Sequence, residues 1–188
     1  MKLWLLRHAR PLVDSGVCYG ALDVAADAQA TLEAAQQAAT ALPADLLVWY
    51  SPLQRCERLA HVLQGLRPDL TMQSEPRLRE MDFGSWEGVR WGAIGLEAMD
   101  AWTQDFGNYR CGGAESANAM LARVGQALED FGRQLAALQC DQGLWITHAG
   151  VARCVQLWTK GLRQLESAAQ WPKDALAWGA LHQVHVHE

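Results

Sequence analysis

Residues 3–10 have the sequence LWLLRHAR, a short apolar run that ends in two basic side chains, Arg7 and His8. A run of this length with almost no polar residues is typical of a strand buried on both faces, as in parallel sheets. In open α/β sheets, ligands bind just beyond the carboxyl ends of such strands. We therefore expect Arg7 and His8 at a ligand-binding edge, although solvated basic residues at a strand end would give the same short pattern.

A second apolar run, residues 144–147, also ends in a histidine, His148. Because the carboxyl ends of parallel strands meet at one edge of a sheet, we expect His8 and His148 to converge. A neutral imidazole can act as a base, a ligand or a nucleophile near neutral pH. The two histidines together therefore indicate a reactive site rather than two strand ends.

A third apolar run, residues 46–50, precedes a segment that predicts a helix with Ser51 as its N-cap and Pro52 at its first position. Arg55 and Arg58 lie in the first two turns of this predicted helix. Arginine is unfavourable beside the positive end of a helix dipole unless an anion binds there, although a solvated basic face is the simpler alternative.

The topology of a parallel sheet brings Arg7, Arg55, His8 and His148 to one point. Arginine provides a planar, permanently charged fork that suits phosphate oxygens. This arrangement predicts a positive pocket for a small dianion, built without a metal.

The remaining patterns alternate between strands and helices. Asp27 is expected to cap a helix that ends before Pro43, and Glu115 and Ser116 are expected to begin a long amphipathic helix. Short strands are expected at 70–73 and within 177–186. These patterns predict an α/β fold, a three-layer sandwich with a mainly parallel central sheet and helices on both faces, forming one domain over residues 1–188.

Composition narrows the class of protein. The chain has 188 residues and a formal net charge of −5, which disfavours nonspecific binding to nucleic acid or to a membrane. Its five cysteines are scattered with no CxxC pair, and its first residues lack the apolar region of a signal peptide. We therefore expect a cytoplasmic protein without a disulfide framework or a structural zinc site. His182, His185 and His187 are interpreted as solvated edge residues rather than metal ligands.

Five segments in order resemble the histidine phosphatase superfamily, which has the phosphoglycerate-mutase-like fold. They are Arg7-His8-Ala9, Ser51-Pro52-Leu53-Gln54-Arg55, the segment LREMDFGSWEG at 78–88, Gly112-Gly113-Ala114-Glu115-Ser116, and Thr147-His148-Ala149-Gly150. Each motif alone is weak, but five in the order of the family are specific.

The resemblance implies a metal-independent phosphomonoester hydrolase that needs no cofactor. His8 would be the nucleophile and form a phosphohistidine, while Arg7, Arg55 and His148 would hold the phosphoryl oxygens. Glu80 would protonate the leaving oxygen and then activate water. The residue types alone leave Asp82 and Glu87 as rivals for this acid–base role, and only the family pattern favours Glu80.

The first loop departs from the family pattern. Ala9 stands where the family has glycine, Pro11 stands where serine or threonine is common, and Asp14 stands where asparagine is common. Because a carboxylate beside phosphate would repel it, we expect Asp14 to point away from the site.

Residues 10–20, RPLVDSGVCYG, are similar to the start of bacterial alpha-ribazole phosphatases, which remove the 5'-phosphate of alpha-ribazole in cobalamin nucleotide-loop assembly. The implied partner is a small-molecule phosphate ester. The chain is shorter than the glycolytic mutases, which favours hydrolysis over mutase activity. A mutase or broad sugar phosphatase of the same fold, and an inactive phospho-ligand binder, stay as alternatives. The oligomeric state stays open, with a homodimer as one option.

Tryptophan is abundant in this chain, with nine residues. Trp4, Trp49, Trp145 and Trp158 fall in strand or helix patterns and are expected in the core. Trp86, Trp91 and Trp102 are expected near the mouth of the site, where they could stack on an aromatic base or serve only as packing.

Overall fold

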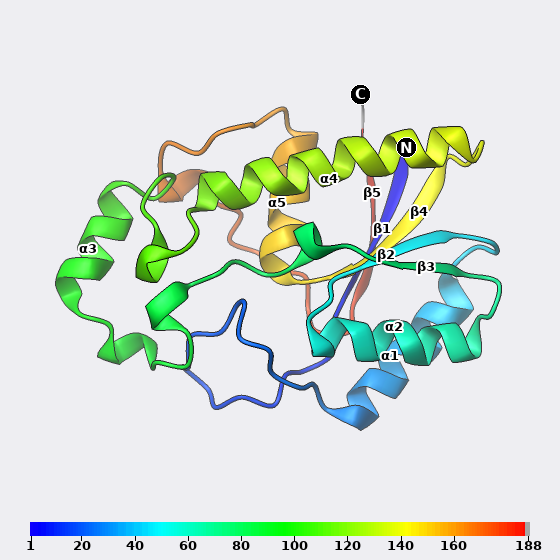
Figure 1. The fold of residues 1–188 in the computed structure, drawn as a ribbon, viewed down its shortest axis with the longest axis horizontal. Coiled ribbons are helices and arrows are strands. Elements are labelled where there is room, and N and C mark those ends of the chain that lie inside the picture. The colour runs from blue at the N-terminus through cyan, green and yellow to red at the C-terminus, as the bar shows by residue number, and fades with distance from the viewer. Residues whose placement is uncertain (187–188) are drawn as a thin grey trace.

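The computed structural model describes residues 1–186 as a five-stranded sheet between helices (Figure 1). The strands are β1 (Lys2–Arg7), β2 (Leu47–Tyr50), β3 (Thr71–Ser74), β4 (Gln142–Thr147) and β5 (Leu181–His185). Their order across the sheet is β3-β2-β4-β1-β5, and all neighbouring pairs are parallel except β1 with β5. The mainly parallel sheet is therefore confirmed. Its last strand, β5, lies at one edge and is antiparallel to β1.

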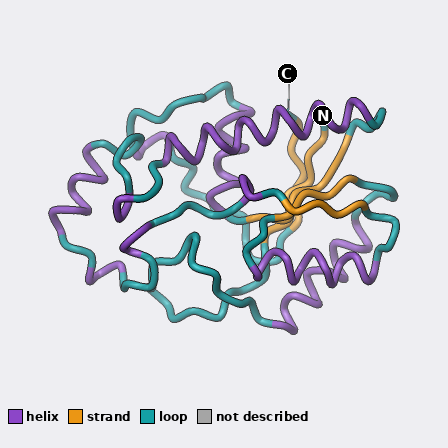
Figure 2. Tube along the Cα trace, viewed as in Figure 1, coloured by secondary structure: helices purple, strands orange, loops and turns teal. Residues whose placement is uncertain are grey.

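Helices cover both faces of this sheet. They are α1 (Ala28–Ala41), α2 (Gln54–Leu66), α3 (Leu96–Gln104), α4 (Ala117–Ala137) and α5 (Ala149–Thr159). Figure 1 shows α1 and α2 on one face and α4 and α5 on the other, while α3 lies apart from the sheet. In Figure 2 the strands lie together between helices on one side of the molecule. Most of the long loops lie on the other side, which carries α3. The predicted three-layer α/β fold is confirmed.

β1 lies between β4 and β5 in the sheet, and its leucine side chains are buried on both faces. Leu3 and Leu5 pack into the core beneath α4 and α5, and Leu6 packs into the core beneath α1 and α2. Arg7 pairs in register with Thr147 at the ends of β1 and β4. This register places the residues that follow the two strands, His8 and His148, side by side.

The predicted cap at Asp27 is confirmed, whereas Ser116, expected to begin the long helix with Glu115, is instead the N-cap of a helix that begins at Ala117. The Asp27 carboxylate accepts from the Ala30 N–H at 2.9 Å, and the Ser116 hydroxyl accepts from the Ala119 N–H at 3.2 Å. These bonds satisfy backbone donors that have no partner inside the helix.

The prediction for the start of α2 is wrong, because Ser51 and Pro52 lie before the helix. The helix begins at Gln54, whose N–H donates at 2.7 Å to a carboxylate oxygen of Asp23. Ser51 is instead engaged with His148, since their Oγ and Nε2 atoms are 2.8 Å apart. The serine therefore serves the site rather than the helix end.

The histidines of the last strand are only partly within view. His182 and His185 lie on β5, and His187 lies outside the described residues. Within residues 1–186, no cluster of three or more His, Cys, Asp or Glu side chains could hold a metal ion. No helix among these residues is long and apolar enough to cross a membrane.

The contact between α4 and α5 depends on Gly125. A Cβ atom at this position would lie 2.0 Å from the ring of Trp158, whereas a Cβ at Gly132 on the same helix would be no closer than 3.6 Å to Met1. The two helices can approach closely only because Gly125 has no side chain. This contact supports α5, which follows directly from His148.

We predict that Gly125→Ala lowers the free energy of unfolding by about 1–3 kcal/mol, because overpacking outweighs the better helix propensity of alanine. Gly132→Ala is the matched control and should raise it by roughly 0.5–1 kcal/mol, since its new methyl group makes only an ordinary van der Waals contact with Met1. Urea denaturation of both variants measures the difference. Equal effects at the two positions would contradict this account of the interface.

Candidate active site

His8 lies directly after β1 with its side chain 1% exposed. Its Nδ1 atom is 2.7 Å from the carbonyl oxygen of Ala9. Because a carbonyl can only accept, Nδ1 must carry the proton. Burial, followed by the charge of Arg55, lowers the pKa of His8 to about 3. The ring is therefore neutral near pH 7, and Nε2 keeps a free lone pair.

His148 is fully buried beside it, with ring centroids 5.1 Å apart. Its Nε2 atom contacts the hydroxyl of Ser51 at 2.8 Å and the thiol of Cys56 at 3.5 Å. Burial lowers the pKa of His148 well below 6.5, and the positive charge of Arg55 adds to this effect. The second histidine is thus also neutral, with its ring orientation fixed by two side chains from the β2–α2 segment.

Arg55 and Arg7 supply the positive charge of the site. Arg55 is fully buried and donates to the carbonyl oxygens of Leu22 at 2.9 Å and Gly20 at 2.6 Å. Arg7 donates to the carbonyl oxygen of Leu176 at 2.6 Å. The Nε atoms of both arginines are buried without a hydrogen-bond partner in the described chain. Orphaned donors of this kind suit an incoming anion.

Arg58 does not join the site. It is exposed on the outer side of α2, while Arg55 points inward. The alternative of a solvated basic side chain holds for Arg58 but not for Arg55.

Glu80 reaches the site from the loop after β3. One carboxylate oxygen accepts from the Gly150 N–H at 3.0 Å, in the first turn of α5, and the other accepts from the Met81 N–H at 3.1 Å. A Cβ at position 150 would lie 2.2 Å from the carboxylate, so Gly150 makes room for it. The carboxylate is therefore held in place by backbone donors and by the shape of the helix end.

The rival carboxylates have other contacts. Glu87 accepts from the N–H groups of Gly20, Ala21 and Leu22 at 2.9–3.1 Å and so holds the loop that binds Arg55. Asp82 accepts from the Gly84 N–H at 2.8 Å. Neither lines the cavity that contains His8, whereas Glu80 does. Among the three, geometry favours Glu80 as the carboxylate that meets a ligand.

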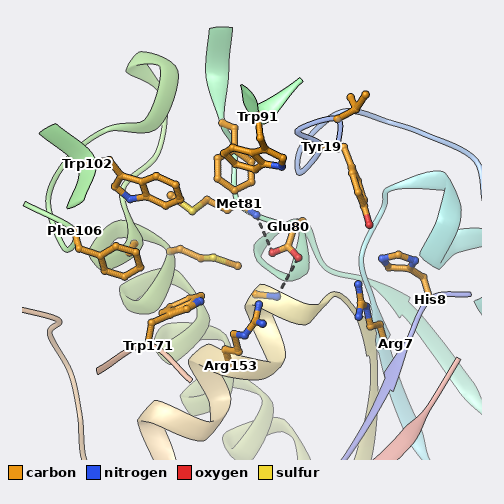
Figure 3. Close-up of a pocket in the computed structure, with 15 residues that line it drawn as sticks. Arg7, His8, Tyr19, Glu80, Met81, Trp91, Trp102, Phe106, Arg153 and Trp171 are labelled. Atoms are coloured by element: carbon orange, nitrogen blue, oxygen red, sulfur yellow. Dashed lines mark hydrogen bonds between the residues drawn. The ribbon is translucent and has the colours of Figure 1, made fainter. Parts of the chain in front are cut away.

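A cavity of about 320 Å³ joins Arg7, His8 and Glu80 to a set of aromatic side chains, while Arg55 and His148 do not line it (Figure 3). Arg7, His8 and Tyr19 lie at one end, and Glu80 and Arg153 lie between that end and the aromatic residues. The Tyr19 ring also lies 5.6 Å from the guanidinium carbon of Arg55. The structure thus brings Arg7, His8, Arg55, Glu80 and His148 together, as the sequence indicated.

The unusual residues of the first loop are accommodated. Asp14 points away from the site, since it is 79% exposed and lies 3.3 Å from Arg90. Positive φ angles at non-glycine residues are confined, within the described chain, to Asp45 and Gln139. Ala9 therefore does not need the backbone freedom of the glycine that the family has.

Sequence reasoning missed several residues of the cavity. Arg153 lies about one turn beyond Gly150 on α5, so helical spacing from the glycine of the Thr147–Gly150 motif could have found it. Tyr19 belongs to the motif at residues 10–20, but the motif alone assigned it no role. Trp171 follows no periodic pattern. Of the three tryptophans expected at the mouth, Trp91 and Trp102 line the cavity, and Trp86 is buried behind them.

Comparison with known proteins agrees with this geometry. The structure of mycobacterial glucosyl-3-phosphoglycerate phosphatase has a TM-score of 0.79 and 22% identity, covering 97% of this chain and 88% of that one. TTHB049 from Thermus thermophilus has a TM-score of 0.71 and 27% identity, covering 98% and 93%. A search of curated proteins gave no significant match. The profile of the histidine phosphatase superfamily (branch 1) matches residues 3–181.

That match spans nearly the whole chain and includes every residue gathered around His8 and Glu80. The chain belongs to the histidine phosphatase superfamily, branch 1, and is a phosphatase that acts on phosphomonoesters.

Proposed function

We propose that this protein is a metal-independent phosphatase that acts through a phosphohistidine on His8, with alpha-ribazole 5'-phosphate as its substrate. The observation that carries the mechanism is the 2.7 Å contact between His8 Nδ1 and the Ala9 carbonyl. It fixes the tautomer in which Nε2 is unprotonated, and burial among cations keeps the ring neutral. A neutral, oriented imidazole is a ready nucleophile.

In the first step, Nε2 of His8 attacks phosphorus and the bond to the leaving oxygen breaks. Arg7, Arg55 and His148 hold the other phosphoryl oxygens, because phosphoryl transfer needs positioning and charge stabilisation above all. The Nε–H groups of the two arginines have no other hydrogen-bond partner in the described chain. Glu80 donates a proton to the leaving oxygen, since an alkoxide leaves poorly without one.

In the second step, the Glu80 carboxylate takes a proton from water. The water oxygen attacks phosphorus, the N–P bond breaks, and phosphate and neutral His8 are formed. The two backbone N–H groups that hold Glu80 keep it in the same place for both steps. Acid–base assistance of this kind is worth about 10²–10⁴ in rate.

The substrate assignment is supported by the resemblance of residues 10–20 to alpha-ribazole phosphatases. In this protein those residues form part of the site, since Tyr19 lines the cavity and the Gly20 carbonyl binds Arg55. A mutase or a broad sugar phosphatase of the same fold would use the same His8 chemistry, so substrate preference decides between them.

The first prediction concerns His8. We expect phosphate release from alpha-ribazole 5'-phosphate in the presence of EDTA, faster than from p-nitrophenyl phosphate or 3-phosphoglycerate, and its loss in His8→Ala. Steady-state release of inorganic phosphate measures this. Slow, comparable rates on all substrates would discard the alpha-ribazole assignment alone. Activity that survives His8→Ala would exclude the phosphohistidine mechanism, and retained phosphate affinity without turnover in the wild type would indicate a binding protein.

The second prediction concerns Glu80. Glu80→Gln should lower kcat on alkyl phosphates by about 10²–10⁴, because neither the leaving oxygen nor water receives acid–base help. With p-nitrophenyl phosphate, whose leaving group needs no proton, we expect a burst of nitrophenolate followed by slow turnover as the phosphoenzyme accumulates. Asp82→Asn is the control and should behave as the wild type. If Glu80→Gln showed no burst and turned over at the wild-type rate, the acid–base role would belong to another residue.

The neutral histidines also affect stability. The pKa of His8 is about 3 in the folded protein, below its ordinary value of 6.5, and the pKa of His148 is lowered in the same direction. At pH values between the lowered pKa of the folded protein and the ordinary pKa of 6.5, the unfolded chain binds more protons than the native state. Stability must therefore fall as the pH is lowered below about 6.5.

The third prediction follows from this linkage. From pH 7 to pH 5 the free energy of unfolding should decrease, with each of the two histidines contributing a slope of up to about 1.4 kcal/mol per pH unit. His8→Gln should lose one of these contributions. Urea denaturation at several pH values measures the slopes. An unchanged slope in His8→Gln would mean that His8 is not held neutral by the fold.

A further inference from the structure

The end of the cavity away from His8 is made of aromatic rings. We call these five side chains the aromatic wall: Phe83, Trp91, Trp102, Phe106 and Trp171. Figure 3 shows Trp91, Trp102, Phe106 and Trp171 arranged around this end, facing Glu80, with His8 and Arg7 on the other side. Because His8 is at the phosphate end, the aromatic wall faces the group that the phosphate is attached to.

This end of the cavity has little negative charge. Met81, Met120, Val17 and Ala117 complete the lining, and Glu80 is the one carboxylate among the described lining residues. Thioether and aromatic surfaces favour flat apolar groups, with which they make dispersion and stacking contacts. A strongly hydrated sugar or a small acid would bury its hydroxyl or carboxylate groups against carbon here.

Packing accounts for part of the aromatic wall. Trp102 stacks on Trp91 at 6.2 Å and on Phe106 at 5.6 Å between centroids, and these contacts fasten α3, which has no buried residue of its own. A purely structural cluster, however, does not explain why buried polar atoms of residues that line a cavity have no hydrogen-bond partner.

Two such atoms lie here. The indole Nε1 of Trp102 and the guanidinium Nε of Arg153 are buried and have no hydrogen-bond partner in the described chain. Arg153 makes one long bond, from Nη2 to the Lys173 carbonyl at 3.3 Å, and has no carboxylate within 4.0 Å among the described residues. A buried donor without a hydrogen bond is unfavourable, and a ligand carrying acceptors would supply the missing bond.

Trp145 provides a contrast. Its Nε1 is also buried without a partner, but this ring lies in the core and lines none of the described cavities. Trp102 and Arg153 differ from Trp145 because both side chains line the cavity.

We infer that Trp102 and Arg153 determine specificity for a leaving group with a flat, apolar ring system that carries hydrogen-bond acceptors, such as the base of a nucleoside. The ring lies against the aromatic wall, and its acceptors receive the two orphaned N–H groups. This inference rests on the proposed phosphatase chemistry at His8, and it adds the residues that read the leaving group.

The test compares two substrates with the same reacting bond. Alpha-ribazole 5'-phosphate and methyl α-ribofuranoside 5-phosphate both release a primary ribose oxygen, and only the first has a base. We expect kcat/KM to be about 10-fold or more higher for the first, since stacking of one base on aromatic side chains is worth about 1–3 kcal/mol. The ratio of the two kcat/KM values is the readout.

Two variants and a control locate the effect. Trp102→Phe keeps a ring and removes the Nε1–H, and Arg153→Lys keeps the charge and removes the Nε–H. Each should lower the ratio by about 3- to 10-fold, the worth of one hydrogen bond. Trp86→Phe alters the same cluster, with its ring 5.8 Å from Trp102, but does not line the cavity. It should leave the ratio at the wild-type value, with thermal melts showing that all variants fold.

The outcomes separate this inference from the function it rests on. If both substrates and p-nitrophenyl phosphate react through His8 with a ratio near one, the specificity inference is wrong and the phosphatase assignment stands. Equal losses in Trp102→Phe and Trp86→Phe would also overturn it, because they would indicate a packing effect. If no phosphomonoester is hydrolysed, the proposed function itself fails.

Discussion

The structure around the active site depends on two arginines, the buried Arg55 and the half-buried Arg7, that have no carboxylate partner among the described residues. A carboxylate beside Arg7 or Arg55 would neutralise the charge that the phosphate needs, so the fold compensates these cations with backbone carbonyls instead. Arg55 uses the carbonyls of Leu22 and Gly20, and Arg7 uses that of Leu176. Desolvation is thereby offset by hydrogen bonds without loss of net positive charge. The loops that supply the carbonyls must then be held by other contacts. One of them, residues 20–22, donates its backbone N–H groups to the Glu87 carboxylate.

The same logic applies to the one carboxylate that enters the cavity. Glu80 is held by backbone donors, and its own segment is fixed because Arg123 donates to the carbonyl oxygens of Arg77, Arg79 and Glu80 at 2.6–3.3 Å. Arg123 is paired with Glu115, so its charge is neutralised away from the phosphate end. Arg123, which supports the site from outside the cavity, is thus paired with a carboxylate, whereas Arg7 and Arg55 are not.

The sequence predicted the parts of this arrangement that follow from local pattern. Apolar runs ending in His8 and His148 indicated two neighbouring parallel strands, and their pairing in register follows from sheet geometry. The start of α2 could not be predicted from the local sequence. The Ser51 hydroxyl could have capped the helix, but in the folded protein it contacts His148, which is distant in sequence. Residue types alone could not decide among Glu80, Asp82 and Glu87, since the three carboxylates lie within one loop. The family pattern favoured Glu80, and the structure separates the three by their backbone partners and by the cavity, which of the three only Glu80 lines.

The two ends of the cavity differ in how they are encoded. The phosphate end comes from residues at strand ends and helix starts, where a fixed topology leaves little freedom. The leaving-group end comes from η2 (Gly84–Trp86), η3 (Trp91–Ala93), α3 and the segment around Trp171, which depend on one another for burial rather than on the sheet. Such segments can change their side chains without disturbing the strands that position His8. In the proposed function, the chemistry therefore depends on the sheet edge, and the choice of substrate depends on the loops that face it.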